Sequence, residues 1–252
     1  MTYHSLTFKI SFFTAQFRKH HIKLYRDTYL MPLPSTICGI IGAILGVNRR
    51  DLKEFASKVD LHCGAELIKF DGYISEIARI FKFPKQKILD IVKKLKDPKK
   101  AKELQPLYKS IMLYRPQYKL AIALNDEDVY FKIIRRLKTL DFKYEIYGGN
   151  DYNFVENIWE IKEAKLITTN IGQGYCLGKD FNDVLIKDES MILSDIVLAD
   201  IKDRLIFAYG AEICTKGKIK AVDDGESKIF VHQASKFLVS ELFLGDEIGC
   251  KF

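Results

Sequence analysis

The chain has 252 residues, of which 40 are Lys or Arg and 33 are Asp or Glu, so its formal net charge is +7. Hydrophobic residues make up 48% and charged residues 29%, which is ordinary for a globular protein and excludes a collagen-like or disordered chain. The length predicts one large domain or two small ones.

The charge is unevenly distributed along the chain. Residues 1–159 hold 28 basic and 17 acidic residues, a net charge of +11, whereas residues 160–252 hold 12 and 16, a net charge of −4. Such an asymmetry indicates one part that faces a polyanion and another that faces solvent or protein.

Residues 6–13 alternate apolar with polar side chains, the period-2 pattern of a half-buried strand. Two prolines then precede Ser35, a good N-cap, and residues 36–46 have isoleucines at helical spacing. The sequence therefore predicts a helix over 35–46, and a second short helix over 51–59.

The next elements are strands over 65–70 and 118–124, separated by a long segment. An amphipathic helix is expected over 127–140, because its isoleucines and leucines lie on one face and its basic residues mostly lie off that face. Residues 143–147 are predicted to form a short strand.

In chain order these elements make a βαββαβ unit, the ferredoxin-like (RRM-like) arrangement, with residues 72–116 inserted between its second and third strands. Within the insertion, residues 83–103 hold eight lysines and three acids. That segment is either a solvated helix face or a surface that contacts phosphates.

After Trp159 the sequence contains short β-branched segments separated by Gly or Asp. They predict a β-rich C-terminal region, and hence an α+β fold with a ferredoxin-like domain over 1–158 and a β-rich domain over 159–252. The G-x-G-x-x-x-G spacing at 172–178 differs from a dinucleotide fingerprint, so we expect a turn there.

The five cysteines are odd in number and never in C-x-x-C spacing, so we expect free and mostly buried thiols in a reducing cytoplasm. Their spacing to the five histidines supports no zinc site, and no cofactor is expected. The longest apolar run, residues 37–47, is too short for a membrane helix of about 20 residues. The first ten residues also lack the pattern of a signal peptide.

A basic loop over residues 18–29 interleaves cations with aromatic rings and histidines. Its candidate RNA-binding residues are Arg18, Lys19, His20, His21, Lys23, Arg26 and Tyr29. This composition suits single-stranded RNA, because cations hold phosphates while rings stack on bases, although an ordinary solvated loop has the same composition. The tandem histidines could also act as acid and base in metal-free RNA cleavage.

Three glycines, Gly39, Gly42 and Gly46, share one face of the first predicted helix. Because each interior glycine costs about 1 kcal/mol relative to alanine, they indicate a close approach of other groups. Tight packing on the sheet explains them, and a second use is a phosphate bound at the free N–H groups of Ser35 and Thr36. The closely spaced aromatics of RNA-binding sheets are missing, so RNA contact is expected mainly through loops.

The segment from Tyr29 to Asp51, Y-x-x-P-x-P-S-T-x-x-G-x-x-G-A-x-L-G-V-x-R-R-D, resembles family five of the CRISPR-associated RAMP superfamily. The turn sequence at 147–151, which contains Gly148 and Gly149, resembles that family's glycine-containing turn. The resemblance covers about residues 5–160.

The resemblance implies a non-catalytic subunit of a type I CRISPR effector, Cascade, which functions in antiviral defence. Such a subunit binds the 5′ handle of the guide RNA and contacts the backbone subunit and the large subunit. The insertion would be the thumb, with target DNA as a further candidate partner near it. Handle contacts would come from the basic loop, from Ser35 and Thr36, and from Gly148 and Gly149.

One subtype of that family cuts repeat RNA with a tyrosine near the first helix and a lysine–histidine pair. Tyr29 matches the tyrosine, but His62 and His232 lack a neighbouring lysine, so no downstream pair is present. The alternative function is a metal-independent endoribonuclease in which His20 or His21 moves protons and Tyr29 positions the attacking 2′-hydroxyl. A ferredoxin-like RNA-binding protein outside CRISPR systems is a third option.

Overall fold

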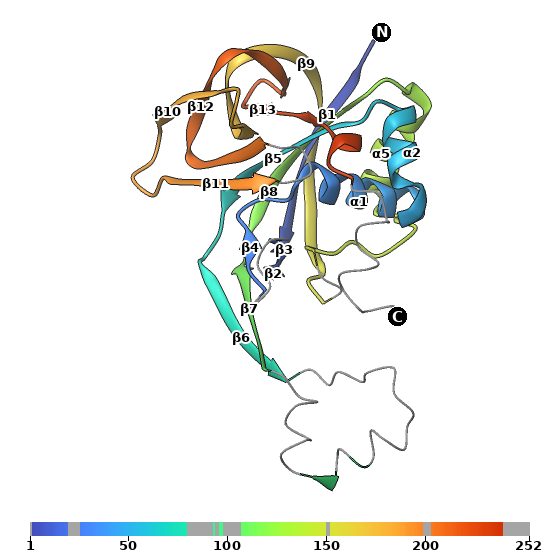
Figure 1. Cartoon of the computed structure of the whole chain (residues 1–252). Coiled ribbons are helices and arrows are strands. Elements are labelled where there is room, and N and C mark those ends of the chain that lie inside the picture. Colours follow the sequence, from blue (N-terminus) through green and yellow to red (C-terminus); the bar gives the residue numbers. More distant parts are fainter. Residues whose placement is uncertain are drawn as a thin grey trace.

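The computed structural model describes residues 2–19, 26–79, 93, 96–97, 107–149, 152–198 and 203–238 (Figure 1). The architecture is mixed α/β, with a curled sheet and few helices. None of the described helices is long and apolar enough to cross a membrane.

A four-stranded antiparallel unit forms the centre of the large sheet, in the order β9-β1-β8-β5. Its strands are β1 (His4–Phe12), β5 (His62–Lys69), β8 (Gln117–Leu124) and β9 (Val155–Leu177). Helices α1 (Pro34–Leu45), α2 (Leu52–Lys58) and α5 (Glu127–Thr139) lie on one side of it (Figure 1). The predictions for both main helices and for the first three strands are confirmed to within a few residues.

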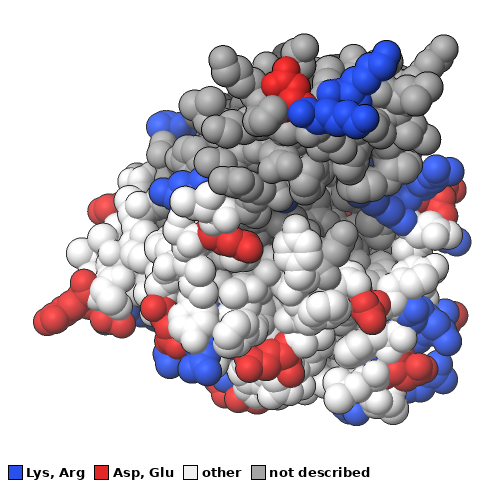
Figure 2. All heavy atoms as spheres, turned by 90° about the horizontal axis from the view of Figure 1, so that it is seen from below, with Lys and Arg blue, Asp and Glu red and all other residues white. Residues whose placement is uncertain are grey.

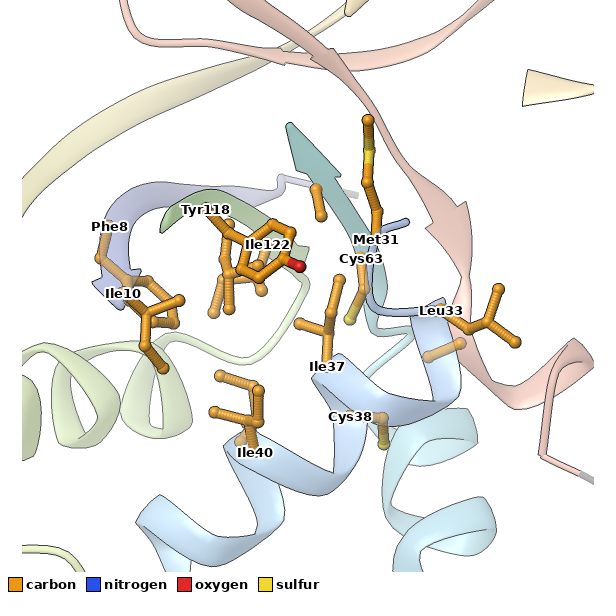
Figure 3. Packing of buried hydrophobic residues seen from close by; sticks show 14 of the residues in the cluster. Phe8, Ile10, Met31, Leu33, Ile37, Cys38, Ile40, Cys63, Tyr118 and Ile122 are labelled. Carbon is orange, nitrogen blue, oxygen red and sulfur yellow. The ribbon is translucent and has the colours of Figure 1, made fainter. Parts of the chain in front are cut away.

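The main core lies between this sheet and the helices. The apolar residues of β1, Leu6, Phe8, Ile10 and Phe12, are at most 1% exposed. Figure 3 shows Phe8, Ile10 and Tyr118 of the sheet facing helix α1. Ser5, Thr7 and Ser11 of β1 are buried too, with Thr7 at 0% exposure, so most of this strand is covered on both faces rather than half-buried as predicted.

Helix α1 begins one residue earlier than expected. Its N-cap is Leu33 with no side-chain cap, Pro34 is the first helical residue, and Ser35 lies inside the first turn. The N-cap prediction for Ser35 is therefore wrong: proline, whose fixed φ suits this position, starts the helix. Gly46, with φ +84°, ends it in the left-handed conformation.

Of the three glycines of α1, only Gly42 packs closely against α2. A Cβ atom at Gly42 would overlap the Cδ2 atom of Leu52. At Gly39 a Cβ atom would meet no described atom within 4 Å. Close packing therefore accounts for Gly42, and the helix end accounts for Gly46.

The predicted strand at 143–147 does not form. Only an isolated bridge joins Tyr147 to Phe154, and β9 takes the fourth place in the unit, antiparallel to β1. Helix α5 is capped by Asp126, whose carboxylate accepts from the Val129 N–H at 3.0 Å.

The β-rich segments after Trp159 form two long strands, β9 and β12 (Asp203–Asp223), with shorter partners. The partners are β10 (Phe181–Ile186), β11 (Ile192–Leu198) and β13 (Lys228–Phe230), while β14 (His232–Gln233) pairs with β5. Strand β9 crosses the expected boundary at 158/159: its first half pairs with β1 and its second half with β12. The division into two domains stays a prediction.

The turn predicted at 172–178 does not form as expected, because Gly172 and Gly174 lie inside strand β9. Gly174 has φ +94°, and a Cβ atom there would overlap the carbonyl oxygen of Ala65 in β5. Glycine is needed at this point because the two backbones touch where β9 crosses β5.

The insertion begins and ends as a two-stranded antiparallel ribbon, β6 (Tyr73–Arg79) and β7 (Leu107–Tyr114), which extends away from the sheet (Figure 1). Strand β2 (Thr14–Ala15) pairs with β7 at the base. Of the lysine-rich segment 83–103, only positions 93, 96 and 97 are among the described residues.

Candidate nucleic-acid interface

The basic loop has an ordered stem. Strands β3 (Phe17–Arg18) and β4 (Thr28–Tyr29) pair, and the backbone N–H of Phe17 donates to Thr28 Oγ1 at 3.0 Å. Lys19 closes the stem, since its N–H donates to the Asp27 carbonyl at 3.0 Å and its ammonium lies 2.7 Å from the Asp27 carboxylate. His20, His21 and Lys23 lie outside the described residues.

This stem docks on the base of the insertion. The Arg26 N–H donates to the Lys109 carbonyl at 2.8 Å, and the Ile111 N–H donates to the Arg26 carbonyl at 2.8 Å. Gln16 adds side-chain bonds, from its amide nitrogen to Ser110 Oγ at 2.6 Å and to the Ile111 carbonyl at 2.9 Å. The basic loop and the base of the insertion, which are separate regions in the sequence, therefore form one surface that includes Lys109.

The Gly148–Gly149 turn supports the stem. The Gln16 N–H donates to the Gly148 carbonyl at 2.7 Å, and the Gly148 N–H donates to the Asn153 carbonyl at 2.6 Å. Gly149 has φ +102°, and a Cβ atom there would overlap the Gln16 carbonyl oxygen. These glycines thus allow the turn to lie directly against the chain that leads into Arg18.

The predicted cations differ in how available they are. Arg18 is exposed and forms no ion pair with any described residue, whereas Lys19 is paired with Asp27 and Arg26 is half-buried. The Lys19 and Asp27 side chains are 23% and 16% exposed, so Lys19 is less available to a phosphate than Arg18. Figure 2 shows basic and acidic residues intermixed on the described surface seen from below.

Tyr29 does not lie at the surface. It is 1% exposed, and its ring stacks on Phe207 with 6.1 Å between ring centroids and 18° between ring planes. The ring is thus covered by protein in this conformation, and the assignment of Tyr29 as an RNA-binding residue stays a prediction. No local pattern around Tyr29 indicates this burial, since Phe207 is far away along the chain.

Ser35 and Thr36 occupy the first turn of α1 and are half-buried. In the described part of the chain, no hydrogen bond links them to the β3–β4 stem. The structure therefore does not join these two residues to the basic loop, and their contact with phosphate stays a prediction.

The sheet face opposite the helices is closed in its middle by the turn between β12 and β13. Asp224 of that turn has a fully buried side chain 2.5 Å from the Lys119 ammonium, and Thr7 Oγ1 donates to its carboxylate at 2.8 Å. Burial alone would raise the pKa of Asp224, but hydrogen bonds from Lys119, from the Ser227 backbone and from Thr7 lower it to about 2. The centre of this sheet face therefore offers no open surface on which a base could stack.

Within the described ranges, no group of three or more His, Cys, Asp or Glu side chains is placed to hold a metal ion. Cys38, Cys63 and Cys176 are buried free thiols, and Cys214 is a half-buried one. Burial raises the pKa of the Cys38 thiol to about 12, so this thiol stays protonated and unreactive near neutral pH.

Comparison with protein families identifies the family of the chain from its first 160 residues, which include the basic loop. A family model described as CRISPR-associated protein (Cas_Cas5) matches residues 5–160. The chain belongs to this Cas_Cas5 family. The family resemblance drawn from the motifs at Tyr29–Asp51 and Tyr147–Asp151 is thereby confirmed, while no curated protein matches the chain.

Three solved CRISPR structures contain a chain similar to this one at low sequence identity. One titled as a Cas protein is 14% identical with a TM-score of 0.43, covering 84% of this chain and 95% of its own. One from a CRISPR RNA-guided surveillance complex is 12% identical with a TM-score of 0.44, covering 84% and 91%. One from a Type III-B Cmr-beta complex bound to cognate target RNA and AMPPnP is 15% identical with a TM-score of 0.36, covering 83% and 86%.

Proposed function

We propose that this Cas_Cas5 protein is a non-catalytic subunit of a type I CRISPR effector that binds the 5′ handle of the guide RNA. The observation that carries the proposal is the joined surface of the basic loop and the insertion, in which the Arg26 backbone bonds to Lys109 and Ile111 of β7. We interpret the strand order β9-β1-β8-β5, with its two crossover helices α1 and α5, as ferredoxin-like.

The chemistry of the joined surface suits a flexible polyanion. Arg18 and Lys109 are exposed cations on neighbouring segments, and Lys19 adds a third cation whose position is held by its bond to Asp27. Guanidinium and ammonium groups bind phosphate oxygens through charge-assisted hydrogen bonds. Because the centre of the sheet is closed by Asp224, the RNA strand would run along loops rather than across the sheet.

The partners that we propose are the backbone and large subunits of the same complex, in the cytoplasm, with target DNA near the insertion. The burial of Tyr29 supports a non-catalytic role, because the tyrosine expected to position a 2′-hydroxyl is packed on Phe207. A metal-independent endoribonuclease is the second candidate, because His20 or His21 could move protons in RNA cleavage.

The first experiment measures binding of a labelled repeat-derived 5′ handle by fluorescence anisotropy at several salt concentrations. Affinity should fall steeply with salt, and Arg18→Ala with Lys19→Ala should reduce the slope by about 0.7 for each phosphate that the variant no longer binds on a single strand. Lys132→Ala with Arg135→Ala, two exposed cations on α5, is the matched control. If both double variants have the same dependence of affinity on salt, the basic loop is not part of the RNA interface.

The second experiment incubates the protein with repeat RNA in EDTA. The proposed non-catalytic role predicts intact RNA. A single defined cut that His20→Ala or His21→Ala abolishes would replace the proposal with the endoribonuclease.

A further inference from the structure

The surface where β1 ends, β7 turns into β8 and β9 begins exposes several aromatic rings, which we call the aromatic corner. Phe13 is 54% exposed and Phe154 is 52% exposed. Phe13 meets Tyr114 edge-on, with 5.5 Å between ring centroids, and Phe154 lies 5.2 Å from the ring of Tyr147. Exposed aromatic rings in a group mark a contact surface more often than isolated ones do.

Arg115 holds the corner in a fixed shape. It has φ +47°, an uncommon conformation for a residue other than glycine, and its N–H donates to the Phe13 carbonyl at 2.9 Å. Its guanidinium lies 5.5 Å from the centre of the Tyr114 ring and forms no ion pair with a described residue. The corner thus presents a cation and exposed rings on a strained, well-tethered turn.

A polar cavity of about 240 Å³ adjoins this turn. It lies at one end of the sheet, away from the centre that the Asp224 turn covers. Its lining residues come from β1, β5, β8, β9 and the turns that follow β5 and β7: Ser11, Lys69, Asp71, Arg115, Gln117 and Glu156. The lining has two cations and two carboxylates, so it has no net charge to attract a phosphate. Donors and acceptors side by side instead match the hydrogen-bonding edge of a nucleobase.

From these observations we infer that the aromatic corner and this cavity bind one unstacked base of single-stranded RNA. The base would stack on the Phe13–Tyr114 side, and its polar edge would face the cavity. The inference rests on the proposed function and deepens it, since Tyr114 belongs to β7, the strand on which the basic loop docks. A strand held by Arg18 and Lys109 would pass along β7 toward this corner.

The test replaces single bases of the 5′ handle by abasic sites and measures affinity for wild type, Phe13→Ala and Phe131→Ala. Phe131 is the matched control, because it is 55% exposed on α5. Stacking predicts one position at which loss of the base weakens wild-type binding about ten-fold, and Phe13→Ala should bind the intact handle about ten-fold more weakly. The abasic change should then have little further effect on Phe13→Ala.

Equal handle affinities for Phe13→Ala and Phe131→Ala would overturn this inference and leave the proposed function standing. A second RNA, oligoadenylate with and without an abasic site, tests base stacking even if handle recognition fails. If wild type binds oligoadenylate but not the handle, handle recognition fails, and the abasic comparison on oligoadenylate still decides base stacking. Binding to neither RNA contradicts both proposals. Normal RNA binding by Phe13→Ala with failed assembly would make the corner a protein contact.

Discussion

The Nζ atom of Lys220 lies 3.0 Å from Nε2 of His62. The other ring nitrogen of His62, Nδ1, lies 2.9 Å from the Asp60 carbonyl oxygen, so Nδ1 carries the proton and Nε2 accepts from Lys220. Asp60 also bonds to Tyr3 and, at 2.8 Å, to Gln233. The cluster thus ties β5 to the N-terminal residues, to β12 and to β14.

This arrangement requires a neutral imidazole. Burial is the main cause that lowers the pKa of His62, and the charges of Lys220 and Lys236 lower it further, against the raising effect of the Asp60 carbonyl and carboxylate. In the unfolded chain the histidine takes up a proton near pH 6.5, whereas folded His62 does so only at a lower pH. Its contribution to stability is therefore complete above about pH 6.5 and falls as the pH drops below it.

Replacing His62 tests this coupling. We expect urea unfolding of wild type between pH 7 and 5 to show a decreasing free energy of unfolding, and His62→Gln to have a smaller decrease, because glutamine does not titrate. Lys220→Met should also reduce the decrease, since it removes a charge that opposes protonation. An unchanged slope in His62→Gln would assign the acid sensitivity to another group, for which half-buried His232 is the first candidate.

The buried pair of Lys119 and Asp224 predicts a large loss of stability when one partner is changed. Asp224→Asn leaves the ammonium of Lys119, a residue 5% exposed, without its buried counter-charge, so the free energy of unfolding should fall by about 3 kcal/mol. Glu226→Gln, in the same turn but with a side chain 57% exposed, is the control and should behave nearly as wild type. Similar losses for both variants would contradict the special role of the buried carboxylate.

The same pair predicts a second acid transition. Because the pKa of Asp224 is about 2 in the folded protein and about 3.8 in the unfolded chain, its contribution is complete above about pH 4 and is lost between pH 4 and 2. The difference corresponds to about 2 kcal/mol. Thermal unfolding of wild type and Asp224→Asn should therefore converge as the pH falls from 4 to 2.

Two glycines should respond to alanine in opposite directions. Gly149→Ala places a Cβ atom on the Gln16 carbonyl in a left-handed backbone, so it should lower the free energy of unfolding by about 2 kcal/mol or more and weaken RNA binding. Gly39→Ala meets no described atom within 4 Å in a helix, so it should raise stability by about 0.5–1 kcal/mol. Chemical denaturation measures both, and a stable Gly149→Ala would mean that the turn can move away from Gln16.

Gln16 should couple the basic loop to the insertion. Gln16→Ala removes the side-chain bonds to Ser110 and to the Ile111 carbonyl, so hydrogen exchange at the amides of Arg26 and Ile111 should become faster and handle affinity should fall. Ser110→Ala removes only one of these bonds and should have the smaller effect. Unchanged exchange in Gln16→Ala would show that the backbone bonds alone hold the stem.

The sequence alone determined the elements whose residues contact one another locally. The alternation at Leu6–Phe12 and the helical spacing in α1 and α5 predicted β1 and both helices, because one apolar face of each must be buried. The motif between Tyr29 and Asp51 also predicted the family. The prediction of a strand at 143–147 was wrong because β9, with more residues to pair along β1, takes that place in the sheet.

Only the tertiary structure decided which surfaces remain open. Tyr29 has the sequence context of an exposed ring in a basic loop, but Phe207 covers it. Thr7 has the pattern of a solvent-facing strand residue, but Asp224, 217 residues away, bonds to it. The basic loop and the insertion are likewise brought together only by packing, when β7 places Lys109 beside Arg26. Such contacts depend on how distant segments pack, which no local pattern of hydrophobicity or charge encodes.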